Sequence, residues 1–308
     1  MALTALVPLD GTKLSESAFA LLPLLKALGF ETVRLAGVWE SAWDERDGGA
    51  ADADLQEAEE KGRSFLSAYL DRQAERVRAA GLQPETRVRV GRPADELLDA
   101  AVGVDLVLIA THGRSGIARW WLGSVADEVV REAKCPVLVI GPNVPEASLS
   151  AFAVKRVLVP LDGSEQAEAA LPLATWIADL TGAEIDIARC LSLTAVAYDP
   201  GMAVYSAELI TSMEDAVKAY LSEVAGRLGG KVHAEMLIGA PGQQLLEYLD
   251  KRPADLVVMT SHGRTGVRRV ALGSVADRML HGPAPVLVFR ATDSAGGLLA
   301  AARERGRA

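Results

Sequence analysis

One segment of this chain occurs twice, and that duplication limits the fold more than any other feature of the sequence. Residues 105–127 and 255–277 are identical at 14 of 23 positions, at an offset of 150 residues. Each copy is a run of β-forming residues, a polar loop rich in glycine, and a Gly-Ser pair before a helical pattern. A chain of 308 residues with this repeat predicts two similar domains of ordinary size.

The loop in each copy suits an anion. Gly113 and Gly123 let the backbone turn tightly and let a ligand approach the main chain. Ser124 begins a predicted helix whose first N–H groups lack partners within the helix, and these groups and the helix dipole favour phosphate. Arginines beside the loops either add to anion binding or form an ordinary solvated surface, and both interpretations stay open. These arginines are Arg114, Arg119, Arg264, Arg268 and Arg269.

Strands and helices alternate in the same order in both halves. Right-handed crossovers between parallel strands place helices on each side of a sheet, so both halves are predicted to be open five-stranded parallel α/β sheets covered on both faces. The predicted strands are residues 3–9, 32–38, 86–90, 106–110 and 137–140, and then 156–161, 184–190, 232–238, 256–260 and 286–289. The predicted helices are residues 15–28 and 55–80, two short helices from Pro93 and Ser124, residues 165–180, one helix ending at Leu228, and two from Pro241 and Ser274.

Composition sets the predicted domain limits. Residues 1–142 and 154–292 are the expected domains, and the Pro- and Ser-containing stretch 143–153 has the composition of a linker. Residues 40–56 lack periodicity and predict a mobile acidic loop, while the small, polar tail 293–308 is expected to be poorly ordered.

Charge and hydropathy exclude several classes of protein. The net charge of −9 and pI near 5.1 argue against a general nucleic-acid binder and against a protein bound to anionic membranes. No uninterrupted apolar run could span a bilayer, and the first residues read as a strand rather than a signal peptide, so a cytoplasmic protein is expected. Cys135 and Cys190 form neither a disulfide framework nor a metal motif, and no metal ligands are predicted.

Two repeated motifs resemble those of the universal stress protein family, in its tandem, ATP-binding form. The first is a strand followed by Asp-Gly-Thr/Ser, and the second is Thr/Ser-His-Gly-x9-Gly-Ser-Val. The family signature Gly-x2-Gly-x9-Gly-Ser/Thr falls on residues 110–124 and 260–274, with Ala110 and Thr260 in place of the first glycine. The resemblance covers nearly the whole chain and implies a Rossmann-like fold of the adenine nucleotide alpha hydrolase-like type.

By this resemblance, each repeat binds ATP, with Mg²⁺ bridging the phosphates. Asp10 and Asp162 would lie near the ribose, Val38 and Cys190 near the adenine, and the loop residues near the phosphates. Ala110 adds one methyl group to the phosphate path whereas Thr260 adds a branched side chain, so the first site is expected to be the more open. The expected nucleotide-binding residues are Asp10, Val38, Ala110, His112, Gly113, Gly123, Ser124, Val125, Asp162, Cys190, Thr260, His262, Gly263, Gly273, Ser274 and Val275.

Other interpretations of these residues compete with nucleotide binding. Asp10 and Asp162 precede helices and could be N-caps, and Ser-Val-Ala-Asp at residues 124–127 and 274–277 fits a capping box. His112 and His262 fit loop-fixing hydrogen bonds better than catalysis. A dinucleotide-binding domain is disfavoured because GxGxxG should follow the first strand, where Asp-Gly-Thr stands.

The resemblance implies a nucleotide-binding protein of the stress response that acts through nucleotide-dependent conformation or partner binding. A slow ATP hydrolase and a dimerisation scaffold with vestigial sites are the alternatives, although neither a Walker lysine nor a nucleophile with a base appears at the loop. An unpaired apolar edge strand is an aggregation hazard, and in this family the last strands pair across a twofold axis. We therefore expect strands 137–140 and 286–289 to pair within the chain, with the two sites facing outward and further homodimerisation left open.

Overall fold

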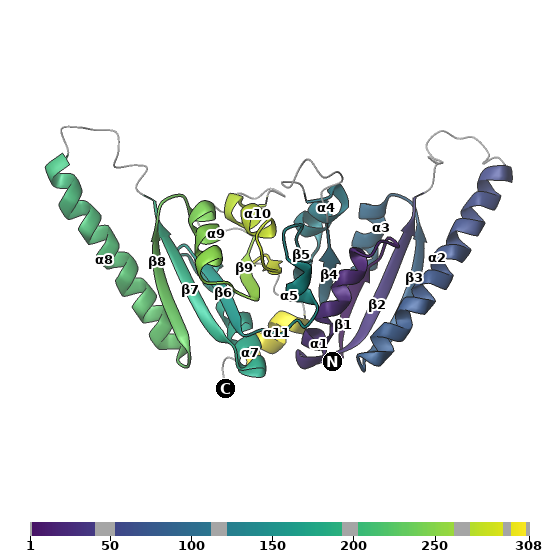
Figure 1. Ribbon diagram of the computed structural model, residues 1–308, viewed down its shortest axis with the longest axis horizontal. Coiled ribbons are helices and arrows are strands. Elements are labelled where there is room, and N and C mark those ends of the chain that lie inside the picture. Colours follow the sequence, from purple (N-terminus) through teal and green to yellow (C-terminus); the bar gives the residue numbers. More distant parts are fainter. Residues whose placement is uncertain are drawn as a thin grey trace.

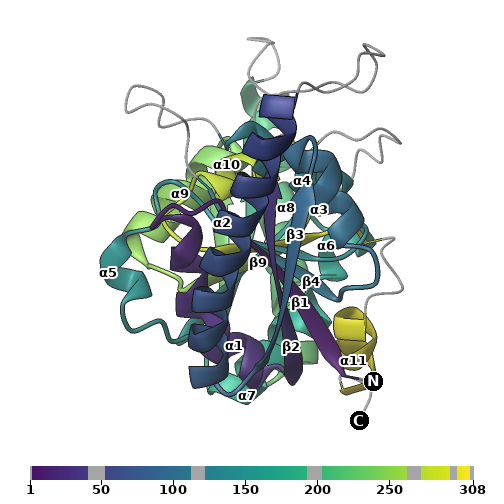
Figure 2. The same cartoon turned by 90° about the vertical axis from the view of Figure 1, so that its right-hand side faces the viewer.

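Ten strands form one continuous sheet with helices on both faces (Figures 1 and 2). This computed structural model describes residues 2–40, 53–111, 122–192, 203–261, 272–291 and 297–305. Along the sheet the strand order is β3-β2-β1-β4-β5-β10-β9-β6-β7-β8. The first half contains β1 (Leu3–Pro8), β2 (Phe30–Trp39), β3 (Gln83–Val90), β4 (Leu106–Ala110) and β5 (Val137–Ile140). The second contains β6 (Arg156–Leu161), β7 (Glu184–Leu191), β8 (Val232–Ile238), β9 (Leu256–Thr260) and β10 (Val286–Phe289).

All pairs within each half are parallel, as predicted. β1 lies between β2 and β4, and β6 lies between β7 and β9. The strands that follow β1 are therefore added first on one side of it and then on the other, and the same reversal occurs at β6. Ligands of open α/β sheets bind beyond the carboxyl ends of the strands at such a reversal. The topology therefore indicates one candidate site in each half.

Helices cover both faces of the sheet. In the first half they are the 3₁₀ helix η1 (Ser15–Leu21), α1 (Leu22–Ala27), α2 (Ala53–Ala79), α3 (Pro93–Ala100) and α4 (Ser124–Glu132), and the short α5 (Glu146–Leu149) lies in the predicted linker. In the second they are α6 (Glu165–Glu168), α7 (Leu171–Thr181), α8 (Ala203–Leu228), α9 (Pro241–Lys251), α10 (Ser274–Leu280) and α11 (Gly297–Arg305). The long helices α2 and α8 lie on the two outer flanks (Figure 1). None of the helices in the described part of the chain combines the length and apolar composition needed to span a bilayer.

The two halves are joined by β5 and β10. These strands pair antiparallel, with Val139 opposite Val286 and Val137 opposite Val288, and their residues are at most 3% exposed. The predicted pairing of the two terminal strands within the chain is therefore confirmed. Side chains alternate across the sheet, so Leu138 belongs to the apolar core on one face and Val139 to the core on the other. Each core includes residues of both halves, and the joint is buried on both sides.

Two expectations about helices need correction. Residues 15–28 do not form one helix: the 3₁₀ helix η1 comes first, and α1 begins at Leu22 with Pro23 in its first turn. Proline lacks the N–H needed deeper in a helix but fits its first turn, and Pro172 has the same place in α7. The second half is likewise split into α6 and α7.

The tail was expected to be poorly ordered, but residues 297–305 of it form α11. Leu298 and Ala302 are buried, 0% and 1% exposed, against the core that contains α7. At the start of the helix, the Gly297 N–H donates to Asp105 Oδ1 of the first half at 2.9 Å. Apolar contact and a helix-end hydrogen bond therefore hold this part of the tail in place.

Candidate functional site

A cavity of about 660 Å³ opens where β1 and β4 end. Its lining brings together every expected binding residue of the first repeat that the structure describes, from four separate segments. Asp10 and Val38 follow or end β1 and β2, and Ala110 ends β4. The expected residues in this lining are Asp10, Val38, Ala110, Gly123, Ser124 and Val125. His112 and Gly113, and in the second repeat His262 and Gly263, lie outside the described residues.

Asp10 is held by the residues that follow it. Its Oδ1 accepts hydrogen bonds from the Thr12 N–H at 3.0 Å and the Thr12 hydroxyl at 2.6 Å. Burial on its own would raise the pKa of Asp10, but the hydrogen bonds of Thr12 and Ser15 outweigh it and lower this pKa below its usual value. Asp10 therefore presents a fixed, ionised carboxylate at the cavity, which can accept hydrogen bonds from hydroxyl groups of a ligand.

The alternative that Asp10 and Asp162 are N-caps is wrong. Leu14 precedes η1 and makes no side-chain cap, and the N-cap of α6 is Ser164, whose hydroxyl accepts from the Ala167 N–H at 3.2 Å. Asp162 instead accepts from the Ser164 N–H and hydroxyl at 2.9 and 2.6 Å. Both aspartates thus make the same local turn, in which a carboxylate bonds to the residue two positions on.

The predicted capping boxes are also wrong. Gly123 and Gly273 are the N-caps of α4 and α10, so each serine is one position inside the helix, and neither cap has a side-chain hydrogen bond. The Asp127 carboxylate reaches forward to Arg131 instead, at 2.8 and 2.9 Å. The first N–H groups of α4 therefore face the cavity without a carboxylate that competes for them, which suits a phosphate group.

Thr111 was not predicted, yet it closes the glycine loop. Its side-chain oxygen accepts a hydrogen bond from the Gly123 N–H at 3.1 Å, which fixes the two ends of the loop against each other. In the second repeat the Gly273 N–H donates to the Ser261 carbonyl at 2.9 Å. Thr-His-Gly and Ser-His-Gly at equivalent positions of the two repeats were the sequence signal for this role.

An ion pair crosses the mouth of the first cavity. Arg92, just before α3, binds both carboxylate oxygens of Glu128 on α4, one of them at 2.8 Å, and also Asp95 at 2.8 Å. Arg92, Glu128 and Glu40 all line the cavity. Sequence reasoning missed these three residues because none of them is repeated: the second half has Ala240, Arg278 and Ser192 at the equivalent positions.

The described residues expected in the second repeat stand at the equivalent places on its strands and helices. Cys190 takes the position of Val38, and its thiol donates to the Pro241 carbonyl at 3.7 Å. Burial raises the pKa of Cys190 to about 11, so this thiol is neutral at ordinary pH. Thr260 is buried at the end of β9, and Gly273, Ser274 and Val275 begin α10 as their counterparts begin α4.

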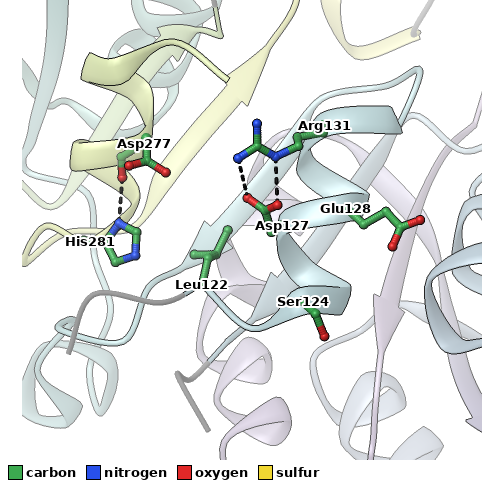
Figure 3. A pocket seen from close by; sticks show the side chains of 7 residues that line it. All are labelled: Leu122, Ser124, Asp127, Glu128, Arg131, Asp277 and His281. Atoms are coloured by element: carbon green, nitrogen blue, oxygen red, sulfur yellow. Dashed lines mark hydrogen bonds and ion pairs between the residues drawn. The ribbon is translucent and has the colours of Figure 1, made fainter. Parts of the chain in front are cut away.

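A second cavity, of about 540 Å³, lies where α4 faces α10 across the joint (Figure 3). Asp127 and Arg131 line it from α4, and Asp277 and His281 line it from α10. The hydrogen bond to Asp127 raises the Arg131 pKa, and the negative charge of Asp277 adds a smaller contribution in the same direction. The first cavity shares two lining residues with this one, Ser124 and Glu128. The helix α4 is therefore a wall between the candidate ligand site and the joint.

Two hydrogen bonds cross the joint at the ends of these helices. Asn143 Nδ2 donates to the His281 carbonyl at 2.8 Å, and the Arg290 guanidinium donates to the Arg131 carbonyl. Asn143 at the start of the predicted linker and Arg290 of the second half thus each bond to a carbonyl near the end of a helix across the joint. His281 Nδ1 also lies 2.7 Å from the Asp277 carbonyl, which keeps the imidazole against α10.

Comparisons with known proteins agree on a single protein family. The model of the family described as "Universal stress protein family" matches residues 1–141 and 153–290. Universal stress protein MJ0531 of Methanocaldococcus jannaschii is 34% identical over 142 residues, which are 44% of this chain and 82% of the relative. Universal stress protein Rv2005c of Mycobacterium tuberculosis is 28% identical over 242 residues, 75% and 78% of the two chains. The crystal structure of a universal stress protein from Archaeoglobus fulgidus shares the fold, with a TM-score of 0.68 and 24% identity over 94% of this chain and 98% of that one.

Proposed function

Since this chain belongs to the universal stress protein family, we propose that it binds ATP beyond the ends of β1 and β4 and at the equivalent place beside β6 and β9. The observation that carries this proposal is the 660 Å³ cavity, which gathers a fixed carboxylate, an apolar strand end and a helix N-terminus. These three groups suit ribose, adenine and phosphate in turn. We also propose residues 1–142 and 154–292 as the two nucleotide-binding domains, joined by residues 143–153.

The described residues fit the ligand at each end. Val38 and Leu97 give the cavity an apolar wall for a base, and the first turn of α4 gives N–H donors for phosphate. Among the described residues, no group of three or more His, Cys, Asp or Glu side chains is placed to hold a metal ion. Mg²⁺ that accompanies ATP would therefore be carried by the phosphates.

The shared wall gives the bound nucleotide a way to affect the rest of the molecule. A ligand on the first turn of α4 touches Ser124, and Ser124 also lines the cavity at the joint. A shift of α4 moves Asp127 and Arg131 relative to Asp277 on α10. Nucleotide occupancy would thus bias the arrangement of the two halves, and through it the choice of a protein partner in a stress response.

The test measures bound nucleotide and then removes the space for phosphate. Protein purified without added ligand is denatured, and the released nucleotide is identified and counted by mass spectrometry. Gly123→Val is then titrated with ATP: φ of Gly123 is −48°, so valine strains no backbone angle but fills the place where phosphate approaches. Loss of one binding site from a folded variant supports the proposal.

Gly226→Val is the matched control, because Gly226 lies in α8 with open space around it. It should bind ATP like the parent protein. The proposal is wrong if the purified protein carries no nucleotide and neither the parent nor the control binds ATP in calorimetry. Release of phosphate from ATP in the same samples would add a slow hydrolase activity to the binding function.

A further inference from the structure

The charges around the first cavity are mostly negative. The Asp10, Glu40 and Glu128 carboxylates line it together with a single guanidinium, that of Arg92, which gives the described lining a formal charge of −2. Arg92 is also paired with Asp95 outside the lining. The Arg92 side chain is 57% exposed and the Glu128 side chain 24% exposed, so their charges act through solvent at the mouth of the cavity.

The second repeat has different charges at the same positions. The hydrogen bonds Gly91 N–H to Trp39 O and Gly239 N–H to Leu191 O fix the equivalence of the two halves there. Counted from these bonds, Ser192 replaces Glu40 and Ala240 replaces Arg92. On the helix that follows the glycine loop, Arg278 replaces Glu128. Asp162 supplies one carboxylate and Arg278 one guanidinium, so the same four positions carry a formal charge of zero.

The Arg278 guanidinium of the second repeat lies on a different helix end from that of Arg92. The Arg278 side chain runs from α10 across the first turn of α9: a Cβ on Gly242 would lie 2.6 Å from Arg278 Cδ. In the first repeat Ala94 occupies the place of Gly242, and the cation comes from the opposite side, since Arg92 precedes α3. At these positions of the second repeat, the cation therefore comes from α10 rather than from the residue before α9, and neither position equivalent to Glu40 and Glu128 holds a carboxylate.

A further cation lies behind the aspartate turn of the second repeat. The Arg189 guanidinium is packed between Gly163 and Tyr220, with Cζ 2.7 Å from the place of a Cβ on Gly163 and 4.6 Å from the ring centre. The counterpart of Arg189 is Gly37, which is covered by Leu66, and Gly11 has nothing within 4 Å. At these positions the second repeat carries more positive charge than the first.

We propose that these charges divide the ligands between the two pockets, so that the second pocket favours the polyphosphate over the monophosphate more strongly than the first does. This inference rests on the proposed binding of adenine nucleotides. ATP carries more negative charge than AMP, and charged groups at a partly exposed mouth act on that difference over several ångströms. We expect the ratio of AMP to ATP dissociation constants to be on the order of tenfold larger in the second pocket at low salt.

The experiment gives the first pocket the charges of the second. The variant Glu40→Ser, Arg92→Ala, Glu128→Arg is titrated with AMP and with ATP, in a chain whose second pocket is blocked by Gly273→Val. A Cβ there would lie 2.8 Å from the Ser261 carbonyl oxygen, so valine displaces the loop end at that pocket. The matched control is Glu146→Arg, an exposed change on α5 that alters the net charge by the same two units.

The triple variant should raise the preference for ATP about tenfold, and the gain should shrink at 0.5 M salt because the charges are screened. The control should leave the preference unchanged. The inference is overturned if the triple variant and the control have the same ratio of AMP to ATP affinity while both still bind. If no variant and no parent binds either nucleotide, the proposed function itself fails, which is a different result.

Discussion

The two halves place opposite charges at the same position of their second strands. In the first half Arg34 on β2 is bound by Glu85 at 3.1 Å and donates to the Ala100 carbonyl at 3.1 Å. In the second half the equivalent residue is Asp186 on β7, which is 0% exposed. Asp186 accepts from the Tyr248 hydroxyl at 2.8 Å and from Arg252 Nε at 2.7 Å.

Between the two halves, the charged residue on the second strand and the residues that bond to it differ together, as one cluster. Counted from the prolines that begin α3 and α9, Tyr248 stands where Ala100 stands, so the hydrogen-bonding group facing the strand changed together with the charge. Burial and the bond to Asp186 raise the Tyr248 pKa, and the same carboxylate raises the Arg252 pKa. A buried charge is tolerated only where such partners satisfy it, so one substitution alone would have been unfavourable.

The largest effect on stability is expected from a substitution that separates the two halves. Val139→Pro places a ring without an N–H in β5, between β4 and β10, and we expect a loss of about 3 kcal/mol or more in unfolding free energy. Residues 144–151 should also become sensitive to protease. Val232→Pro, at the first position of the edge strand β8, is the control and should cost much less. If both variants keep the parental protection and a single unfolding transition, β5 and β10 are not the joint.

Asp186→Ala should be the next largest effect. It leaves the Tyr248 hydroxyl without its buried acceptor, whereas Arg252, 34% exposed, keeps its bond to Glu184. A buried donor left unsatisfied costs about 1–3 kcal/mol. The matched change Arg34→Ala removes a half-exposed pair and should cost about 1 kcal/mol or less. Urea unfolding followed by circular dichroism measures both values. Equal losses would mean that the two clusters contribute alike despite their different burial.

At the proposed adenine ends of the two pockets, Cys190 stands where the first repeat has Val38. A pKa of about 11 lies well above the usual 9.0, so at pH 8 the folded chain has about a hundredfold less thiolate at Cys190 than the unfolded chain. Alkylation by iodoacetamide, measured on the Cys190 peptide by mass spectrometry, should be slower in the native protein by about that factor. It should speed up as pH rises towards 11. A native rate close to the rate in urea would show that the thiol is not shielded as described.

The smallest effect is expected from exchanging the two residues at the first glycine position. Thr260→Ala gives the second pocket the side chain of Ala110, and Ala110→Thr does the reverse. A branched side chain beside the phosphate path should cost about 1 kcal/mol, so each exchange should change ATP affinity at its own pocket about fivefold, in opposite directions. Calorimetry in chains with the other pocket blocked measures this. Changes of the same sign in both variants would show that these residues do not control access.

Sequence alone predicted most of the strands, because buried parallel strands are short apolar runs bounded by turn residues. The pairing of β5 with β10 was expected from the resemblance to the family and from the short linker that tethers the two repeats. Sequence reasoning failed where one residue type fits two local interactions equally well. Ser124 could be an N-cap or the first helical residue, and only the Gly123 backbone decides between them. The ion pair between Arg92 and Glu128 joins residues 36 positions apart. Because the second half has other residues at both positions, the internal repeat gave no signal for this pair.

The hydrogen bond between Gly297 and Asp105 has a consequence for the order in which the molecule is completed during synthesis. Asp105 also accepts from the Thr4 N–H at 2.8 Å, so a single carboxylate ties strand β1 near the first residues to helix α11 near the last. Among the described residues of the second half, the equivalent Asp255 accepts from the N–H groups of Lys155 and Arg156, at the start of β6. Residues 297–305 are made after all ten strands, so Asp105 gains its bond to Gly297 only after the strands of both halves have been synthesised.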